Sequence, residues 1–555
     1  MSGEDAKQAA EQVIGLQWPD WVLIVLYAAS TIALGLYFSR RQKSMQDYFT
    51  GGGNMNPMLI GVSLFATLLS TISYLSVPGE AAGKGPVNQI SLLGLPVVFF
   101  VVAYLMLPIY MKFRVTSAYE LLEEKLGLGL RLLGATMFLA LRLVWMTLLV
   151  YLAAEAMTVM MGLDPKWIPV VAAVTGVVAV IYTSLGGLQA VVITDFLQTV
   201  LLFGGALLVV ATVTYDFGGF GWIPTGWHAN WDSQPLLPIE DGAVSFKLRV
   251  SGLGALLSST IWYIATLGGD QTTVQRFMAT TDTKAARRAL ATQLIVGSVV
   301  TVTLCAVGFS LLGYFEKNLD QLPDSIRLKD NADKLFPRYI AYHLPVGVSG
   351  LVVAAMFAAA MSSIDSGVNS VTAVVLRDFI SRFRKTEMSE KAQLRLARIL
   401  AVSIGGFVVL SSTLMRFIQG NITEMTGKTV NLLTVPIFGL FFFALFVRNP
   451  RPWAVWLGTI VGTATAVMIA FSGPLTYMVF DQFGINPEVF GTEFIELKDK
   501  VTGEMRTSCN DPISFQWISP LALAVTMIVG WVGCRIGGSG SRPLPPADEI
   551  ASSTE

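Results

Sequence analysis

Residues 358–370 read AAAMSSIDSGVNS, a polar stretch inside an otherwise apolar window over residues 338–375. Hydroxyl, carboxylate and carbonyl oxygens are the ligands that suit a hard cation such as Na⁺. The stretch therefore predicts an ion site, and the alternative is hydrogen bonding between helices by serine side chains. The polar residues are spaced i, i+3, i+4 and i+7, which predicts one stripe along a helix: Ser362, Asp365, Ser366 and Asn369.

The composition around this stretch indicates a polytopic membrane protein. Of 555 residues, 53% are hydrophobic and 14% are charged, whereas soluble domains carry about 25% charged residues. The 38 basic and 38 acidic residues give no net charge, so no bulk basic field points to nucleic acid. Three cysteines and two histidines are too few for a disulfide framework or a zinc site.

A membrane-spanning helix needs about 20 mostly apolar residues, and thirteen windows of this kind occur along the chain. The residues before the first window are polar and carry acids, so no cleavable signal peptide is expected. The windows are 20–39, 57–82, 89–113, 132–160, 167–184, 189–213, 248–270, 288–315, 338–375, 396–416, 428–447, 452–474 and 514–536.

Lysine and arginine in the short loops predict the orientation. With the N-terminus outside and thirteen spans, the basic clusters fall on the cytoplasmic side and the longer loops 214–247 and 475–513 fall outside. The cytoplasmic clusters include Arg40/Arg41/Lys43, Lys112/Arg114/Lys125/Arg131, Arg276/Lys284/Arg287/Arg288 and Arg377/Arg382/Arg384/Lys385.

The segments between the windows are too short for an ATPase or kinase domain, and no GxxxxGK[ST] motif occurs. An ion gradient is therefore the expected energy source. No nucleophile–base pair is apparent, so we expect no enzyme activity and no organic cofactor. Residues 537–555 are expected to form a disordered cytoplasmic tail.

Three further features point to function. Asp195 lies in the apolar sequence GGLQAVVITDFLQTVLLF and is interpreted either as a cation ligand or as an interfacial acid hydrated by the cytoplasm. The hydroxyl-rich segment 61–79 ends in Pro78-Gly79, and segment 262–271 carries paired glycines before Asp270. Interrupted helices free carbonyls that can coordinate a cation. The alternative for 268–270 is simply the cytoplasmic end of a helix.

These stretches resemble the sodium/solute symporter family, which contains sodium–glucose, iodide, multivitamin, monocarboxylate, proline and sialic acid cotransporters. The resemblance runs from about residue 18 to 537. It rests on DYFTGGGNM (47–55), LPIYMKFRVTSAYELLEEKLG (107–127), YTSLGGLQAVVITDFLQ (182–198), GGDQTTVQRFMA (268–279) and AAAMSSIDSGVNSVTAVVLRDF (358–379).

The resemblance implies an all-α, LeuT-type fold of two inverted five-helix repeats with about thirteen transmembrane helices. The implied organisation begins with an extracellular segment (1–19) and an extra first helix with a cytoplasmic loop (20–56). Repeat 1 (57–213), an extracellular loop (214–247) and repeat 2 (248–447) follow. Two C-terminal helices (448–536) with the extracellular loop 475–513 precede the tail (537–555).

The resemblance also implies sodium ligands. The family's common sodium site would use backbone carbonyls of Ala66, Leu69 and Ala359 and the hydroxyls of Ser362 and Ser363. A second sodium site would use Asp195, Ser362, Asp365 and Ser366. Asp365 departs from the hydroxyl often found there, so two carboxylates near one cation either tighten Na⁺ binding or hold a proton instead.

The substrate residues of the family transfer poorly. Leu68 and Leu92 stand where sugar carriers place an asparagine and a glutamate, which weakens the sugar interpretation. Arg142 lies in an apolar window, where it either pairs with a substrate carboxylate or snorkels to the cytoplasmic face. The candidate pocket residues are Ser70, Ser73, Tyr74, Gln89, Tyr263, Thr266 and Arg142.

The predicted function is secondary active transport, in which one or two inward Na⁺ drive uptake of a small organic solute by alternating access. The solute classes considered are a sugar, sialic acid, a monocarboxylate or a vitamin. The alternatives are a proton-coupled symporter on the same fold, or a transporter-like sensor or channel. The expected location is the plasma (inner) membrane. The expected partners are the solute and the lipid bilayer, and no nucleic acid.

Overall fold

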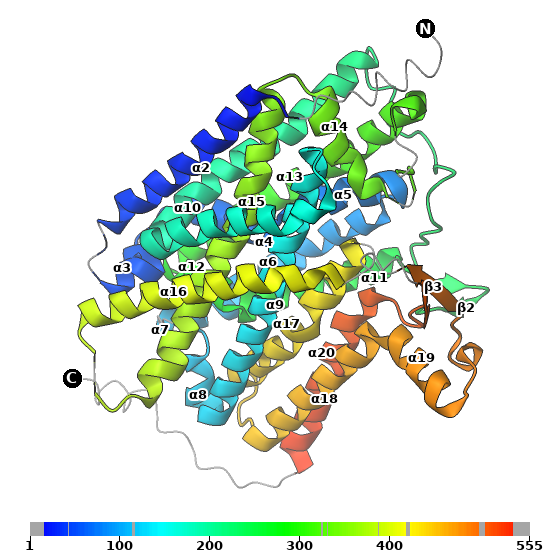
Figure 1. The fold of residues 1–555 in the computed structure, drawn as a ribbon. Coiled ribbons are helices and arrows are strands. Elements are labelled where there is room, and N and C mark those ends of the chain that lie inside the picture. The colour runs from blue at the N-terminus through cyan, green and yellow to red at the C-terminus, as the bar shows by residue number, and fades with distance from the viewer. Residues whose placement is uncertain are drawn as a thin grey trace.

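The computed structural model describes residues 16–40, 42, 44–113, 117–322, 326–329, 331–386, 388–417, 422–498 and 505–536. The chain forms a bundle of long helices with two small β-hairpins at one end (Figure 1). The expected N-terminal segment lies mostly outside the described residues, because residues 1–15 are not among them. The expected tail, 537–555, lies entirely outside them.

Ten helical segments of the described chain are long and apolar enough to cross a membrane. The segment Val87–Phe113 combines η2 (Val87–Gly94), α6 (Leu95–Phe100), the π-helical η3 (Val101–Met106) and α7 (Leu107–Phe113). The others are α2 (Trp18–Ser39), α9 (Leu128–Met160), α10 (Ile168–Asp216), α13 (Thr283–Lys317), α15 (Val348–Val374) with the π-helical η7 (Val375–Ser381), α16 (Glu390–Ser412), α17 (Ile422–Phe446), α18 (Pro452–Ala470) and α20 (Ile518–Ile536).

Shorter elements complete the bundle. A bent pair, α4 (Pro57–Leu68) and α5 (Thr71–Gly83), turns by 67° at its break, and α11 (Gly252–Gly269) is followed directly by α12 (Gln271–Met278). The remaining short α-helices are α3 (Met45–Thr50), α8 (Glu120–Leu126), α14 (Leu335–His343) and α19 (Ser472–Phe483). The antiparallel hairpins pair β1 (Ile239–Glu240) with β2 (Ala243–Val244), and β3 (Phe494–Lys498) with β4 (Met505–Cys509).

The 49 residues of α10 consist of two helical halves joined at a sharp kink at Gly187. A straight helix of this length would extend about 74 Å, far more than the roughly 30 Å of a bilayer core. Gly187 has φ +56°, and an added Cβ would lie 2.8 Å from the Tyr48 carbonyl oxygen. Only glycine fits this backbone and this contact, and the two halves correspond to the separate windows 167–184 and 189–213.

The expectation of one helical window over 338–375 is wrong in detail. The helix α14 ends at His343, and α15 begins at Val348. Between them, Asp20 of α2 caps the N-terminus of α15, because its Oδ1 accepts the backbone N–H groups of Gly347 at 2.7 Å and Gly350 at 2.8 Å. The extra first helix is thereby fixed to the helix that carries the serine stripe.

A charged network that runs from the buried Asp378 to the exposed Arg382 connects α8, α9 and η7. Arg131 Nε donates to Asp378 at 2.7 Å, and its Nη1 donates to Glu123 at 2.6 Å. Arg382 Nη2 donates to Glu123 at 2.7 Å, and Ser117 Oγ donates to Asp378 at 2.6 Å.

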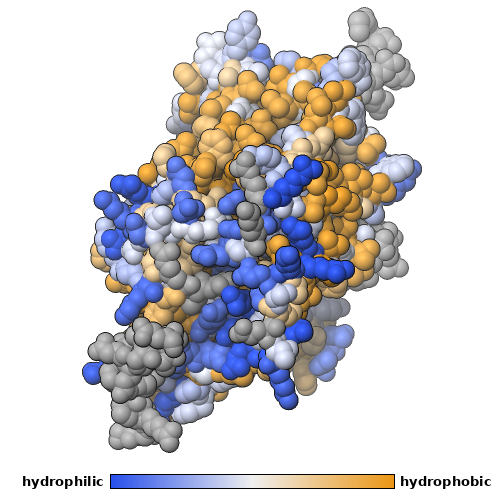
Figure 2. Space-filling model, turned by 90° about the vertical axis from the view of Figure 1, so that its left-hand side faces the viewer, coloured by the Kyte–Doolittle hydropathy of each residue, from blue (hydrophilic) through white to orange (hydrophobic). Residues whose placement is uncertain are grey.

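On the side of the molecule with α3 and the start of α16, hydrophilic residues gather between hydrophobic flanks (Figure 2).

Candidate functional site

Two helix breaks lie at the centre of the bundle. At the first, α4 ends at Leu68, Leu69 is extended, and the Ser70 side chain caps α5 by accepting the N–H of Ser73. At the second, the extended Asp270 caps α12 by accepting the N–H of Thr272 at 2.8 Å. Residues 268–270 are therefore a break between two helices and not the end of a span at the membrane surface. Both breaks leave backbone groups at helix ends without partners in the helix.

Asp195 is fully buried on α10 and receives hydrogen bonds from two other helices. Ser63 Oγ on α4 donates to its Oδ2 at 2.5 Å, and Ser362 Oγ on α15 donates to its Oδ1 at 2.5 Å. The interpretation of Asp195 as an acid hydrated at the interface is wrong, because its side chain has no solvent exposure. Its carboxylate joins three helices at one point.

The expectation that Arg276 belongs to a cytoplasmic loop cluster is also wrong. Arg276 lies on α12, is 1% exposed, and its Nη2 lies 3.5 Å from Asp195 Oδ2. Its Nε donates to Ser63 Oγ at 2.9 Å and its Nη2 donates to Ser366 Oγ at 2.5 Å. A buried carboxylate requires a partner of opposite charge, and this guanidinium is the partner.

Asp365 is the second buried carboxylate of this cluster. The Tyr182 hydroxyl donates to its Oδ2, and Ser366 Oγ donates to its Oδ1 at 3.2 Å. Ser366 Oγ in turn lies 3.1 Å from Thr67 Oγ1 at the end of α4. The stripe of α15 thus faces both α10 and the break in the α4/α5 pair.

The oxygens assigned to the common sodium site come from α15 and the C-terminal end of α4. Ser362 Oγ lies 3.5 Å from the Ala66 carbonyl oxygen, and Leu69 is the extended residue after α4. Ala359 and Ser363 are buried on α15. The Ser363 hydroxyl has no hydrogen-bond partner within the described residues. A buried hydroxyl without a partner is a group that a hard monovalent cation can use as a ligand.

A small pocket of about 30 Å³ lies between the two breaks and is lined by Thr67 and Leu68 at the end of α4. Its charged residues are Arg142 and Asp270, and Trp145 and Trp262 contribute aromatic surface. The full lining is Thr67, Leu68, Leu141, Arg142, Trp145, Trp262, Thr266, Asp270, Val430 and Thr434.

Arg142 pairs with Asp270 across the pocket, with Nη2 2.5 Å from Oδ2. Its side chain is 10% exposed, so the guanidinium remains in the bundle and does not snorkel to a membrane face. The Nε of Arg142 and the hydroxyl of Thr266 are buried without a hydrogen-bond partner within the described residues. Both polar atoms belong to residues that line the pocket and are available to a solute.

The other five candidate pocket residues are not among those lining this pocket. The Tyr74 hydroxyl donates to the Leu202 carbonyl at 2.9 Å in a separate part of the core. Ser70 and Ser73 form the cap of α5. Gln89 lies on η2 and Tyr263 on α11, both partly buried.

The residues of this site that sequence reasoning missed include Ser63, Tyr182, Arg276 and the pocket-lining Trp262. One available signal was the demand for charge, because two acids inside apolar windows require a buried cation. Arg276 is the basic residue of GGDQTTVQR nearest to the predicted break. Ser63, Tyr182 and Trp262 gave no signal, because isolated serine and aromatic residues are common in membrane helices.

Comparison with known proteins identifies the family of the chain. The sequence profile of the sodium:solute symporter family matches residues 48–462. The chain belongs to the sodium:solute symporter family. Among relatives of this symporter, the sodium/sialic acid symporter of Aliivibrio fischeri is 30% identical over 473 residues, covering 84% of this chain and 90% of that protein. The sodium/sialic acid symporter of Proteus mirabilis is 28% identical, covering 84% and 92%.

Solved structures share the fold of this symporter. A Na⁺-coupled sialic acid symporter in a substrate-bound, outward-open state matches with a TM-score of 0.73 and 24% identity, over 95% of this chain and all of that one. Mhp1, a nucleobase-cation-symport-1 family transporter, matches with a TM-score of 0.56 and 10% identity, over 91% of this chain and 98% of that one. The fold is therefore LeuT-like, and the chain is a multi-pass membrane protein.

Proposed function

We propose that the protein couples inward Na⁺ movement to uptake of a small organic solute by alternating access. The observation that carries this proposal is the position of residues 66–69. Ala66 and Leu69 supply carbonyls assigned to sodium, while Thr67 and Leu68 between them line the pocket. An ion and a solute that both contact one broken helix must each affect the conformation that the other binds.

The proposed common sodium site consists of the carbonyls of Ala66, Leu69 and Ala359 with the hydroxyls of Ser362 and Ser363. When bound there, Na⁺ supplies the charge that membrane voltage acts on. The residues of the chain do the rest: the ligands connect the C-terminal end of α4 to α15. Filling the site therefore favours the conformation in which these helices are close together.

A second sodium ion at Asp195, Ser362, Asp365 and Ser366 is part of the proposal, giving one or two Na⁺ per solute. Within the described residues this cluster holds two carboxylates and one guanidinium, that of Arg276, which forms its ion pair with Asp195. This imbalance also favours the alternative of a proton-coupled symporter. At about 100 mV, one inward Na⁺ provides about 2.3 kcal/mol, and a roughly tenfold gradient adds about 1.4 kcal/mol. One ion then concentrates a neutral solute by roughly 500-fold.

The proposed solute carries a carboxylate. A guanidinium recognises a carboxylate through paired hydrogen bonds, and Arg142 has a buried Nε without a partner beside the Thr266 hydroxyl within the described residues. Relatives named for their solutes include sialic acid, multivitamin and monocarboxylate transporters. A sugar remains the weaker candidate, because the apolar Leu68 lines the pocket. An amide side chain at that position would form hydrogen bonds with the hydroxyl groups of a sugar, and leucine does not.

The proposed topology has thirteen spans, the N-terminus outside and the C-terminus inside, with repeats over 57–213 and 248–447. Thirteen follows from the ten long segments, the bent α4/α5 pair, the second half of α10 and the α11/α12 pair. The proposed location is the plasma (inner) membrane, where a sodium gradient is available.

The decisive experiment is uptake into proteoliposomes with an imposed Na⁺ gradient, repeated over a panel of sialic acid, monocarboxylates, vitamins and sugars. Accumulation that requires inward Na⁺ supports the proposal. Accumulation driven by a pH gradient alone supports the proton-coupled alternative. Flux without accumulation indicates a channel, and Na⁺ or solute binding without flux indicates a sensor.

A further inference from the structure

The helix α19 (Ser472–Phe483) follows α18 (Pro452–Ala470) after a bend at Phe471 and leaves the bundle sideways (Figure 1). Its 12 residues extend about 18 Å, which is too short to cross a bilayer core of about 30 Å. The transport site described above does not include it. Its surroundings therefore have to be explained separately.

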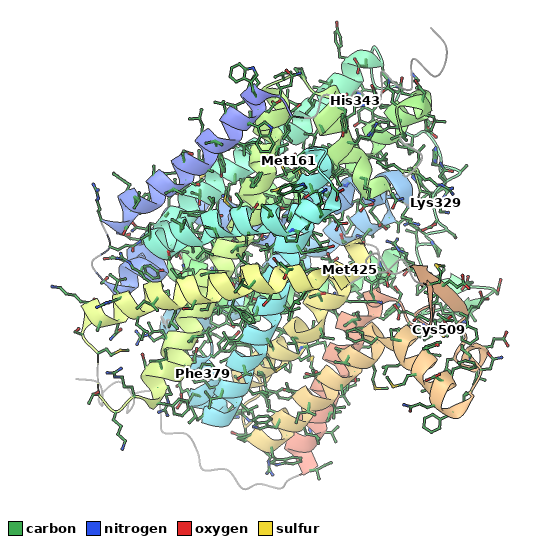
Figure 3. All side chains as sticks on the ribbon, in the orientation of Figure 1. Met161, Lys329, His343, Phe379, Met425 and Cys509 are labelled. Carbon is green, nitrogen blue, oxygen red and sulfur yellow. The ribbon has the colours of Figure 1, made fainter. Side chains whose placement is uncertain are left out.

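One side of α19 is covered by protein. The Gly473 N–H donates to Asp511 Oδ1 at 2.8 Å, and a Cβ at Gly473 would lie 2.3 Å from the Cys509 carbonyl oxygen. Phe480 packs edge-to-face against Phe494 of β3, with ring centroids 4.9 Å apart. Figure 3 labels Cys509, the last residue of β4, in the hairpin that lies next to α19.

The uncovered side is apolar and exposed. We define the α19 patch as Phe471, Leu475 and Met478, which are 48%, 37% and 52% exposed. Their spacing of i, i+4 and i+7 places them on one face of a helix. Contiguous apolar surface of this kind on a protein marks an interaction site.

The α19 patch continues a lipid-facing surface. Met468 in the last turn of α18 is 64% exposed, and α18 is one of the apolar segments long enough to span the membrane. Met468 lies three residues before the bend at Phe471 and Leu475 lies four residues after it, so the patch begins in the chain where the exposed apolar surface of α18 ends. The acyl chains against the end of α18 are therefore the nearest apolar material for the patch.

We propose that α19 is an interfacial helix whose patch inserts into the lipid leaflet at the C-terminal end of α18. The ligand is phospholipid, at the boundary between headgroups and acyl chains, where short amphipathic helices lie in the membrane plane. Asp481 and Gln482, in the last turn of α19, are exposed polar residues that follow Met478 at i+3 and i+4, so the apolar patch ends at Met478. The hairpin β3–β4 then covers the side of α19 away from the patch.

Spin labelling of the full chain in lipid nanodiscs tests this placement. Single cysteines replace Leu475 or Met478 in a background in which Cys305, Cys509 and Cys534 are serine, and each variant is checked by gel filtration. Two matched labels calibrate the measurement. Met468→Cys reports acyl chains, and Asp241→Cys, in the exposed turn between β1 and β2, reports water.

The accessibility of each label to oxygen and to a water-soluble nickel chelate is compared. We expect labels at 475 and 478 to resemble the label at 468, with an oxygen-to-nickel ratio several-fold above that at 241. A ratio equal to that at 241 would mean that the patch faces water and would overturn the proposal. Protection from both reagents would also overturn it, because the patch would then lie against protein, such as a second copy of the chain.

Discussion

The Ser363 hydroxyl is buried on α15 without a hydrogen-bond partner within the described residues. A hydroxyl in that state costs free energy unless a ligand uses it. We therefore expect Ser363→Ala to raise the Na⁺ concentration for half-maximal thermal stabilisation about tenfold, equivalent to about 1.4 kcal/mol. Stability in K⁺ should not fall, because the substitution removes no hydrogen bond of the protein.

The matched control for Ser363→Ala is Ser370→Ala on the same helix. The Ser370 hydroxyl donates to the Ser366 carbonyl oxygen at 2.7 Å, so it is already satisfied. It is not among the proposed sodium ligands, and its loss should leave the Na⁺ midpoint unchanged. An equal shift in both variants would show that the serines act through the packing of α15 and not through the ion.

The Asp195–Arg276 pair predicts non-additive substitutions. Asp195→Asn keeps an oxygen for only one of Ser63 and Ser362 and presents an NH2 group to the other. It also leaves the charge of Arg276 poorly compensated, which costs about 3 kcal/mol or more. In Asp195→Asn/Arg276→Gln no unpaired charge remains from this pair, so thermal stability should recover while Na⁺-dependent stabilisation stays weak. Asp164→Asn, in the exposed pair with Lys166, should change stability by less than about 1 kcal/mol. Additive losses in the double variant would contradict the pairing.

For single residues, the sequence predicts which side chains belong to the site better than it predicts which other side chains they contact. Asp195 and Asp365 stand out because an acid inside an apolar window is costly. Their contacts with Arg276 and Tyr182 join residues more than 80 positions apart. Such contacts depend on how the helices pack, which the periodicity of one helix does not contain. Arg276 was misplaced because its neighbours in the chain resemble those of a loop.

The break between α11 and α12 carries the next prediction. Asp270→Asn retains an oxygen to cap α12 through the Thr272 N–H, but it releases the Arg142 guanidinium from its ion pair. We expect higher affinity for carboxylate solutes and lower stability without solute, measured by thermal shift with and without each solute. Affinity for neutral solutes should not rise.

Asp270→Ala serves as the comparison for this substitution, because it also removes the helix cap. Loss of an N-cap costs about 1 kcal/mol, so this variant should be less stable than Asp270→Asn while sharing its preference for carboxylates. A carboxylate affinity that falls in both variants would show that Arg142 is not the solute's anchor.

The short helix α14 predicts how stability depends on pH. His343 lies at the opposite end of the molecule from Phe379 (Figure 3). Burial, together with nearby Arg338, lowers the pKa of His343 from 6.5 to about 4. Between these values the unfolded chain binds a proton that the folded chain does not, so stability is full above about pH 6.5 and falls as the pH drops to about 4.

Melting temperature measured from pH 7.5 to 4 tests this expectation. His343→Gln should flatten the profile between about pH 6.5 and 4, whereas His228→Gln, at the exposed contact with Glu316, should leave the His343 contribution in place. An unchanged profile in His343→Gln would assign the pH dependence to other groups.

The hydrophobicity of the sequence predicts where the helices lie more accurately than it predicts where they are broken or kinked. Each of the thirteen apolar windows overlaps a helix, because spanning length and apolar character are local properties. The kink at Gly187 and the separation of α14 from α15 depend on contacts with Tyr48 and Asp20. Those contacts come from other helices, so a window average extends straight across such breaks.

The arrangement of charge over the whole molecule predicts its orientation. The hydrophilic face beside α3 and the start of α16 (Figure 2) matches the side to which the basic clusters were assigned. Alkaline phosphatase, which is active only outside the cytoplasm, should be active when fused after Gly226 and inactive when fused after Lys385. Green fluorescent protein fused after residue 555 should fluoresce. The opposite pattern of activities would reverse the topology.

The cap that Asp20 places on α15 has a consequence for the mechanics of transport. The helices that move together need not be those of one proposed repeat. The helix α2 lies outside both proposed repeats, and yet its Asp20 accepts hydrogen bonds from backbone amides at the start of α15. Any change in the tilt of α15 has to carry α2 with it or break two hydrogen bonds to a buried carboxylate. In the proposed transport cycle the first helix would therefore move with α15 or resist its movement, and its lipid contacts would give membrane thickness a way to influence the rate of exchange.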